Sequence, residues 1–160
     1  MNKRLQTIVD KVIHAEESPA HLALSCCLGI FFACSPFLGI QTILLLGVGL
    51  LFGLNTPIAL IVLFLVNNPL TMVPIIILDY VTGYFFVRYL LGYDISYAVP
   101  AFLTKIDNHI HHRLNSWFPN MQFSFAYYII GGLIFALLCS LLAYPFLVHW
   151  FKKLKPSKRV

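Results

Sequence analysis

The chain reads, from Pro19 to Val87, PAHLALSCCLGIFFACSPFLGIQTILLLGVGLLFGLNTPIALIVLFLVNNPLTMVPIIILDYVTGYFFV, a stretch with one Asp and no Glu, Lys or Arg. An apolar run of this length is typical of a segment that enters a lipid bilayer. Three polar breaks interrupt it, namely Cys34-Ser35-Pro36, Asn55-Thr56-Pro57 and Asn67-Asn68-Pro69. Irregular backbone at membrane depth is tolerated only where protein or a water-filled cavity satisfies its polar groups. The stretch therefore predicts an all-α integral membrane protein with discontinuous, re-entrant helical hairpins.

The composition of the whole chain agrees with this class. Of its 160 residues, 59% are hydrophobic and 11% are charged, and the mean hydropathy is +0.83. Soluble domains carry about 25% charged residues. A single domain this small cannot bury apolar runs of this total length, which argues against a soluble protein with a very apolar core.

The positive charge gathers at the C-terminal end. Five of the eleven basic residues lie in residues 152–160, and the formal net charge is +5. Basic flanks stay on the cytoplasmic side of a membrane, so we expect both termini to be cytoplasmic. A nucleic-acid patch is the other interpretation of the tail, but no aromatic or motif context supports it.

The patterning divides the chain into five segments. Residues 1–17 predict an amphipathic helix in the membrane interface. Residues 18–91 form the membrane core, 92–122 a polar, histidine-rich loop with a surface helix, 123–151 a transmembrane helix, and 152–160 a basic cytoplasmic tail. Ser18 is expected to cap the first core helix, with Pro19 as its first residue.

Within the core, the prolines predict four helices of unequal length: 19–34, 36–53, 57–66 and 69–91. At 1.5 Å per residue, 57–66 covers about 15 Å, half of a roughly 30 Å hydrocarbon layer, whereas 69–91 covers about 35 Å and can span alone. Some helices are thus expected to stop inside the membrane and turn back.

Two of the breaks resemble each other at an offset of thirty-three residues, which pairs Phe31 with Phe64, Ser35 with Asn68, Pro36 with Pro69 and Ile43 with Ile76. Paired interruptions in corresponding positions are typical of a transporter site at the interface of a pseudo-repeat. Chance similarity between two apolar, proline-containing segments is the alternative.

The same breaks carry a family resemblance. The ordered motifs are Ser18-Pro19, Gly29, Phe31-Phe32, Ser35-Pro36, Gly39-Ile40-Gln41-Thr42, Asn55-Thr56-Pro57, Asn68-Pro69-Leu70-Thr71 and Gly83. Over residues 18–91 the chain resembles the bacterial family of unknown function numbered two thousand and sixty-two. The resemblance implies a small inner-membrane protein without known catalytic residues. Because relatives are sometimes joined to glycosyltransferase-like domains, it also implies an envelope glycosyltransferase as a partner. The segment 92–122 is expected to lie outside the shared pattern.

Polar side chains near the breaks are the candidate substrate-binding groups: Ser35, Gln41, Thr42, Asn55, Asn67, Asn68 and Thr71. The structural breaks themselves are assigned to Pro36, Gly39, Pro57 and Pro69. A proline frees a carbonyl group one turn back, and amides and hydroxyls can bind a headgroup without a buried charge. A helix that begins at Pro36 or Pro69 would point free N–H groups at an anion. Alternatively, these side chains only satisfy the broken backbone.

Asp79 is the eighth candidate, because an ionisable residue ten positions into a long apolar helix is costly and is a functional candidate by default. We expect it to be protonated, or paired with Tyr80, Tyr84 or Arg88, with a role in proton coupling or headgroup contact. A carboxyl group that is merely hydrogen-bonded inside the bundle is the alternative.

Other chemistry finds little support. A metal site is one interpretation of His109, His111 and His112, but a surface helix with histidines at the membrane interface explains them better. The four cysteines lie in apolar segments without metal spacing, so neither a disulfide nor a metal is expected. No nucleophile, phosphate-loop or paired-carboxylate motif occurs, so we expect no enzyme and no cofactor.

Two functions follow. The first is a small inner-membrane transporter or flippase-like protein that holds a lipid-linked or amphiphilic anion at a polar mid-membrane site. Because one chain has few helices, it would be a homo-oligomer among membrane lipids. The second is a membrane scaffold or accessory subunit for an envelope glycolipid enzyme.

Overall fold

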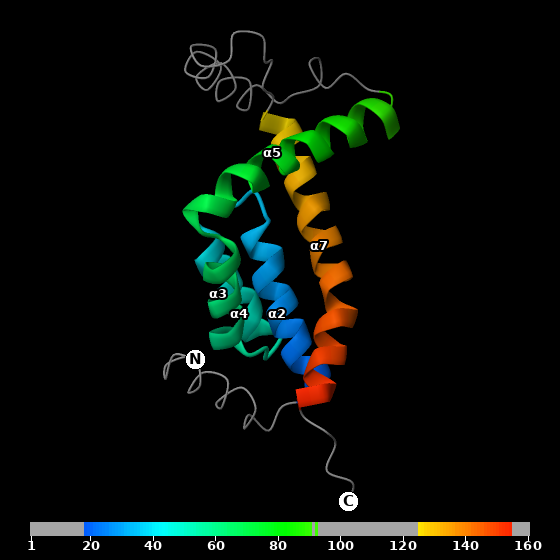
Figure 1. The fold of residues 1–160 in the computed structure, drawn as a ribbon. Helices are drawn as coiled ribbons and strands as arrows, with labels where there is room; N and C mark the ends of the chain where they lie inside the picture. Colours follow the sequence, from blue (N-terminus) through cyan, green and yellow to red (C-terminus); the bar gives the residue numbers. More distant parts are fainter. Residues whose placement is uncertain (1–17, 91, 93–124, 155–160) are drawn as a thin grey trace, which may run out of the picture. The chain divides into compact units, whose positions relative to one another are not determined.

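The computed structural model describes residues 18–90, 92 and 125–154, and these residues form helices and no strand (Figure 1). The elements are α2 (Pro19–Ala33), α3 (Gln41–Leu51), α4 (Thr56–Val66), α5 (Pro69–Phe85), the π-helical turn η1 (Phe86–Leu90) and α7 (Phe125–Leu154). The all-α class predicted from the sequence is confirmed. The helix predicted in residues 1–17 and the surface helix predicted in 92–122 lie outside the described residues.

The chain divides into two compact units. The first unit comprises the chain up to Asn68 and from Ala136 onward, and the second comprises Pro69–Phe135. The first unit therefore holds α2, α3, α4 and the C-terminal part of α7. The second holds α5, η1 and the N-terminal part of α7.

The N-termini of two helices are capped by the side chains that precede them. The Ser18 hydroxyl accepts a hydrogen bond of 3.2 Å from the backbone N–H of His21, and Pro19 is the first residue of α2, as predicted. The Asn55 carbonyl oxygen Oδ1 accepts a bond of 3.2 Å from the N–H of Ile58 at the start of α4. Each cap satisfies a donor that a helix leaves open at its first turn.

Helix α3 ends in a turn that reverses the chain toward α4. Gly53 has a φ of +61°, the left-handed conformation that a side chain disfavours. The N–H of Leu54 donates to the carbonyl of Gly49 at 2.8 Å, and the N–H of Gly53 donates to that of Leu50 at 3.2 Å. This pair of bonds is the Schellman arrangement, which satisfies the last carbonyl groups of the helix.

The start of α3 differs from the prediction. The sequence predicted a helix from Pro36, but α3 begins at Gln41. Gly39 has a φ of +92°, which no right-handed helix can contain, and the N–H groups of Ile40 and Gln41 both donate to the carbonyl of Phe37. The segment from Cys34 to Ile40 is therefore a turn, and no helix N-terminus exists at Pro36.

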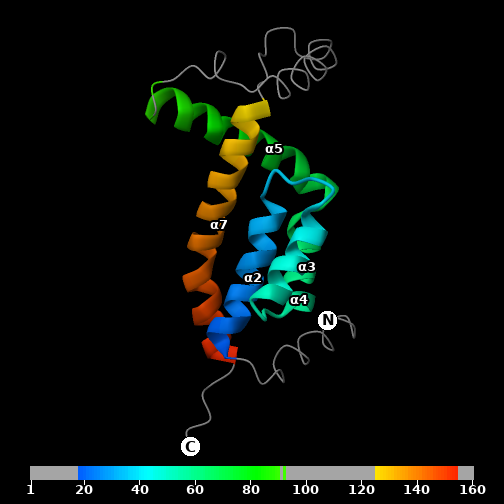
Figure 2. The same cartoon turned by 180° about the vertical axis from the view of Figure 1, so that it is seen from behind.

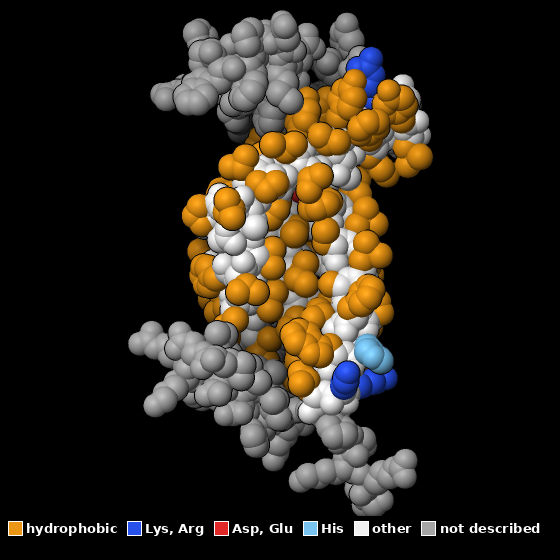
Figure 3. Space-filling view, in the orientation of Figure 1, with side chains coloured by type: hydrophobic (Ala, Val, Ile, Leu, Met, Phe, Trp, Pro, Cys, Tyr) orange, Lys and Arg blue, Asp and Glu red, His pale blue; other side chains and the backbone are white. Residues whose placement is uncertain are grey.

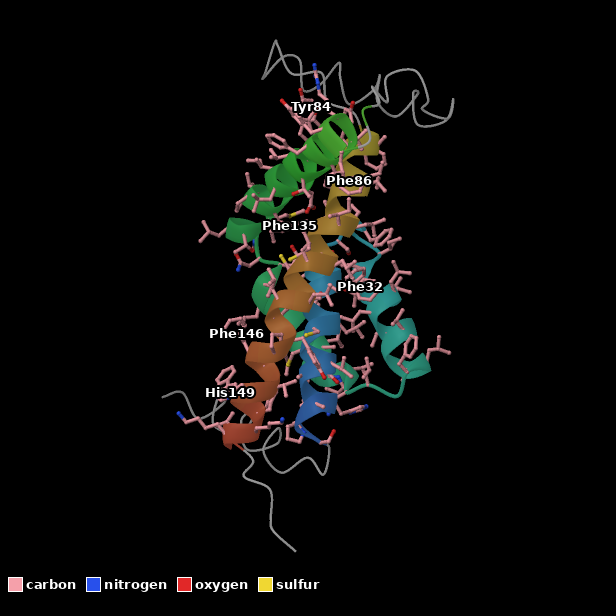
Figure 4. All side chains as sticks on the ribbon, turned by 90° about the vertical axis from the view of Figure 1, so that its right-hand side faces the viewer. Phe32, Tyr84, Phe86, Phe135, Phe146 and His149 are labelled. Carbon is pink, nitrogen blue, oxygen red and sulfur yellow. The ribbon has the colours of Figure 1, made fainter. Side chains whose placement is uncertain are left out.

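Helices α2 and α4 lie side by side in the first unit (Figures 1 and 2). A Cβ atom on Gly29 of α2 would collide with the carbonyl oxygen of Ala59 and lie 2.9 Å from the Cβ of Val62 on α4. The missing side chain thus allows the two backbones to touch. Phe32, labelled in Figure 4, is buried farther along α2 with Leu45 and Leu63.

The C-terminal part of α7 completes the first unit. The thiol of Cys27 on α2 donates to the carbonyl of Ser140 at 3.4 Å, and the Ser140 hydroxyl contacts the carbonyl of Cys27 at 3.2 Å. Phe151 is buried in one apolar cluster with Leu22 and Ile58. The end of α7 therefore lies beside the first turns of α2 and α4.

The second unit is built on a crossing of two glycines. A Cβ atom on Gly83 of α5 would collide with the carbonyl oxygen of Tyr127, and one on Gly131 of α7 would collide with that of Asp79. The two glycines thus allow the backbones of α5 and α7 to touch. The helix predicted over 69–91 ends in the π-helical turn η1 instead of a regular α-helical turn, a difference that hydrophobic patterning does not distinguish.

Two helical stretches are long and apolar enough to cross a membrane, namely Pro69–Leu90 and Phe125–Leu154. Only 17% and 33% of their most apolar windows are buried, whereas the core helix of a soluble protein is mostly covered. Hydrophobic side chains dominate the visible face of the described helices (Figure 3), and Phe146 of α7 points outward (Figure 4). Length and composition thus give weak support for a membrane location.

The contact at Gly29 can be tested against a matched glycine. Gly29→Ala should lower the free energy of unfolding by about 1–3 kcal/mol, because the new methyl group has no room beside Ala59 and Val62. Gly47→Ala in α3 meets no atom within 4 Å and should raise stability by up to about 1 kcal/mol. Denaturant titration in detergent micelles measures both, and equal effects would contradict the close approach of α2 and α4.

Candidate functional site

The direction of the helices decides which polar residues of the first unit gather. The Ser25 hydroxyl on α2 accepts a bond of 2.9 Å from the N–H of Asn55, and Gly29 faces Ala59 farther along. Helices α2 and α4 are therefore parallel and in step. Gly49, near the end of α3, faces Thr56 at the start of α4, so α3 runs the opposite way.

This arrangement places five of the predicted residues at one end of the unit, where α2 and α4 finish and α3 begins. We call it the polar end, and it consists of Ser35, Gln41, Thr42, Asn67 and Asn68. Asn55 lies at the opposite end, one helix length or about 16 Å away. The three breaks thus do not form one cluster.

Two members of the polar end satisfy the broken backbone. Ser35 is buried, and its hydroxyl donates to the carbonyl of Phe32 at 2.9 Å. The Asn68 side-chain amide donates to the carbonyl of Leu65 at 3.2 Å. Each therefore satisfies a carbonyl group that the end of α2 or α4 leaves open.

Gln41 differs from these two residues. It is half-buried at the first position of α3, and its oxygen Oε1 is fully buried without a hydrogen-bond partner among the described residues. A buried carbonyl oxygen without a donor is costly. Thr42 and Asn67 are also half-buried at this end, where α3 begins without a side-chain cap. Gln41, Thr42 and Asn67 are therefore the groups best placed to bind a ligand.

Asn55 has a structural role in the geometry. Its side chain caps α4, and its backbone N–H donates to the Ser25 hydroxyl, which in turn donates to the carbonyl of His21 at 3.0 Å. Ser25 was not singled out from the sequence. A serine inside an apolar helix was the available signal, but its partner depends on how α2 and α4 pack.

The other two predicted residues, Thr71 and Asp79, belong to the second unit. Thr71 lies in the first turn of α5 and is half-buried. Asp79 is 1% exposed, and both carboxyl oxygens are buried without a hydrogen-bond partner. The carboxyl oxygens thus bond to none of Tyr80, Tyr84 and Arg88, whereas protonation, the other expectation, stays a prediction. Arg88 instead donates to the Tyr84 hydroxyl at 2.6 Å and lies 5.4 Å from the centre of its ring.

Metal binding finds no support within the described ranges, which contain no group of three His, Cys, Asp or Glu side chains that could hold an ion. The predicted alternative for His109, His111 and His112 stays a prediction, because these residues lie outside those ranges. The four cysteines are free thiols.

The comparison with protein families assigns the chain. The model of the family described as "Uncharacterized protein conserved in bacteria (DUF2062)" matches residues 2–160. The chain belongs to this family. The resemblance seen in the sequence is confirmed, but its extent was underestimated, because the match also covers 92–122. No curated protein matches the chain, and no solved structure matches it.

The structural role of Asn55 gives a direct test. Asn55→Ala should lower the free energy of unfolding by about 1 kcal/mol, because the first turn of α4 loses its cap. Ser25→Ala should cost about 1–3 kcal/mol, since it leaves the Asn55 N–H without an acceptor. Chemical denaturation in micelles measures both variants. A fully stable Ser25→Ala protein would show that this bond does not hold α2 to α4.

Proposed function

We propose that this chain is a multi-pass protein of the bacterial inner membrane that acts as a small transporter or flippase-like protein. In this proposal the polar end holds the head of a lipid-linked or amphiphilic anion. The observation that carries the proposal is the buried, unpartnered oxygen of Gln41 at the junction of helices too short to cross a bilayer.

The lengths of the helices support a site inside the membrane. Helix α2 has 15 residues and α3 and α4 have 11 each, which correspond to about 22 and 16 Å against a hydrocarbon core of roughly 30 Å. Lys152 and Lys153 follow Phe151, which packs beside the first turns of α2 and α4. Basic residues favour the cytoplasmic interface, so the polar end would lie about 20 Å into the layer.

This depth refines the expected position of the site. A site at the midplane would lie about 15 Å from the cytoplasmic interface, whereas the polar end lies nearer the opposite one. The α3–α4 hairpin would then be re-entrant, with its Gly53 turn on the cytoplasmic side and both helix ends at the polar end. Such an arrangement keeps irregular backbone within protein, as the bilayer requires.

The residues of the polar end fit an uncharged binding surface. Gln41 and Asn67 carry amide donors and acceptors, and Thr42 carries a hydroxyl group. Helix α3 begins without a side-chain cap, so the N–H groups of its first turn after that of Gln41 add donors and the positive end of a helix dipole. These groups can recognise the phosphate and the neighbouring hydroxyls of an amphiphile while its acyl chains stay in lipid. A homo-oligomer would supply the further helices that a pathway needs.

A second function, a scaffold or accessory subunit for an envelope glycosyltransferase, is favoured by one finding. The family match extends through 92–122, so this polar segment lies within the matched region. A docking role would depend on that segment, and the polar residues of the polar end would then have a structural role only.

Substitutions at the polar end test the first function. In native mass spectrometry with added phosphatidylglycerol, Gln41→Leu and Asn67→Leu should each lose the lipid adduct by about tenfold, since one good hydrogen bond to a charged group is worth about 1.5 kcal/mol. Asn55→Ala, at the opposite end of α4, is the matched control and should keep it. Unchanged lipid binding in both leucine variants would show that the polar end is not the binding site.

Deletion of residues 92–122 separates the two functions. If the chain is a transporter, the deleted protein should lose the glycosyltransferase in a pull-down but still move lipid in proteoliposomes. If the chain is a scaffold, the full chain should bind the glycosyltransferase through 92–122, and neither the full chain nor the deleted protein should move lipid. Circular dichroism of the deleted protein checks that its helices form.

A further inference from the structure

The carboxyl group of Asp79 is buried without a hydrogen-bond partner, and it does not belong to the polar end. It is the one carboxylate among the described residues, and its side chain is 1% exposed. Neither carboxyl oxygen has a hydrogen-bond partner there. A buried carboxylate without a partner costs far more than an unpaired neutral group. Something must therefore neutralise the charge.

No cation within the described second unit can do so. Its other charged residue is Arg88, nine positions farther along, which is about 13 Å along the helix. The Arg88 guanidinium donates to the Tyr84 hydroxyl and lies over the same ring, and its side chain is exposed. Arg88 therefore pairs with Tyr84 and not with Asp79.

The surroundings of Asp79 also exclude water. Gly83 and Gly131 are buried where α5 and α7 touch, and Tyr127 and Tyr128 of α7 are 5% and 6% exposed. The titratable side chains that α7 places at the crossing are Tyr127 and Tyr128, and the neighbouring tyrosines on α5 are Tyr80 and Tyr84. A tyrosine side chain never carries a positive charge, so none of them supplies a counter-charge.

The crossing itself is made by the same residue. The carbonyl oxygen of Asp79 lies against Gly131, so the backbone that positions the carboxyl group also forms the contact between α5 and α7. The buried carboxyl group and the backbone contact between α5 and α7 therefore belong to the same residue.

We propose that the Asp79 carboxyl group is a proton-binding site that holds the α5–α7 crossing closed when protonated and releases it on losing the proton. The ligand is one proton, which passes to water when the crossing opens. The ionised oxygens then need hydration that the closed crossing does not admit, so deprotonation favours the open form. This inference concerns the second unit alone and stands whether or not the polar end binds a lipid.

Hydrogen–deuterium exchange tests the proposal on the full chain in lipid nanodiscs. As pH rises from about 5 to 9, the exchange of amides in 75–85 and 127–133 should increase in the wild type by up to tenfold per pH unit relative to Asp79→Asn, because one proton is linked to opening. Comparing the two proteins at each pH cancels the intrinsic rise in exchange. Residues 19–33 of α2 serve as the internal control and should not differ.

A positive control shows how fast these amides exchange when the crossing is open. Gly83→Ala should open the crossing at every pH, because its methyl group collides with the carbonyl of Tyr127. In infrared spectra of the wild type at neutral pH, a protonated carboxyl band that Asp79→Asn lacks should be present.

Three results would overturn the proposal. One is an Asp79→Asn protein that keeps the pH-dependent exchange of the wild type. Another is an infrared spectrum in which Asp79 is ionised at neutral pH while the crossing stays protected. The third is protection at alkaline pH that requires sodium, which would make the ligand a metal cation instead of a proton.

Discussion

Contact between helix backbones at glycine is the constraint on which the described structure depends. If the chain lies in lipid, as proposed, its apolar side chains gain little by leaving their surroundings, and its helices associate through close packing and polar contacts. Gly29 brings α2 against Ala59 and Val62 of α4, and Gly83 with Gly131 brings α5 against α7. Each position lets a carbonyl oxygen approach a Cα–H group, a weak contact that recurs at helix interfaces. Backbone contact at glycine thus holds helices together within each of the two units.

The short helices depend on this packing more than on their own propensity. A helix of 11 residues, such as α3 or α4, is marginal in isolation. Each gains from a defined end, the Schellman turn at Gly53 for α3 and the Asn55 cap for α4. The bond from Asn55 to Ser25 then ties that cap to α2. Local turn chemistry and packing therefore support each other at the same residues.

Much of this fold could be predicted from the sequence, because its helix ends are marked by local chemistry. Ser18 and Pro19 start α2, and Pro69 starts α5, where they were expected. Pro36 misled the prediction, since a proline can begin a helix or lie in a turn, and the backbone of Gly39 decides between them. That conformation is not visible in a pattern of hydrophobicity.

The site was harder to predict than the fold for a related reason. Residue type marked Gln41 and Asn55 equally, but they lie at opposite ends of the first unit because α3 runs against α2 and α4. Which polar residues lie close together depends on the direction of each helix. Composition and residue spacing do not predict that direction. Likewise, depth in an apolar helix marked Asp79, but only the folded structure shows that its carboxyl oxygens have no hydrogen-bond partner among the described residues.

The chain passes between the units at two points, and its backbone conformation differs between them. At Phe135–Ala136 it continues through the interior of α7, where helical hydrogen bonds hold the backbone. At Asn68–Pro69 it leaves a break, because Asn67 has the non-helical angles φ −92° and ψ 77°. The boundary after α4 is therefore marked by a local backbone conformation, whereas the boundary inside α7 has no local signal and follows only from the contacts that each part of the helix makes.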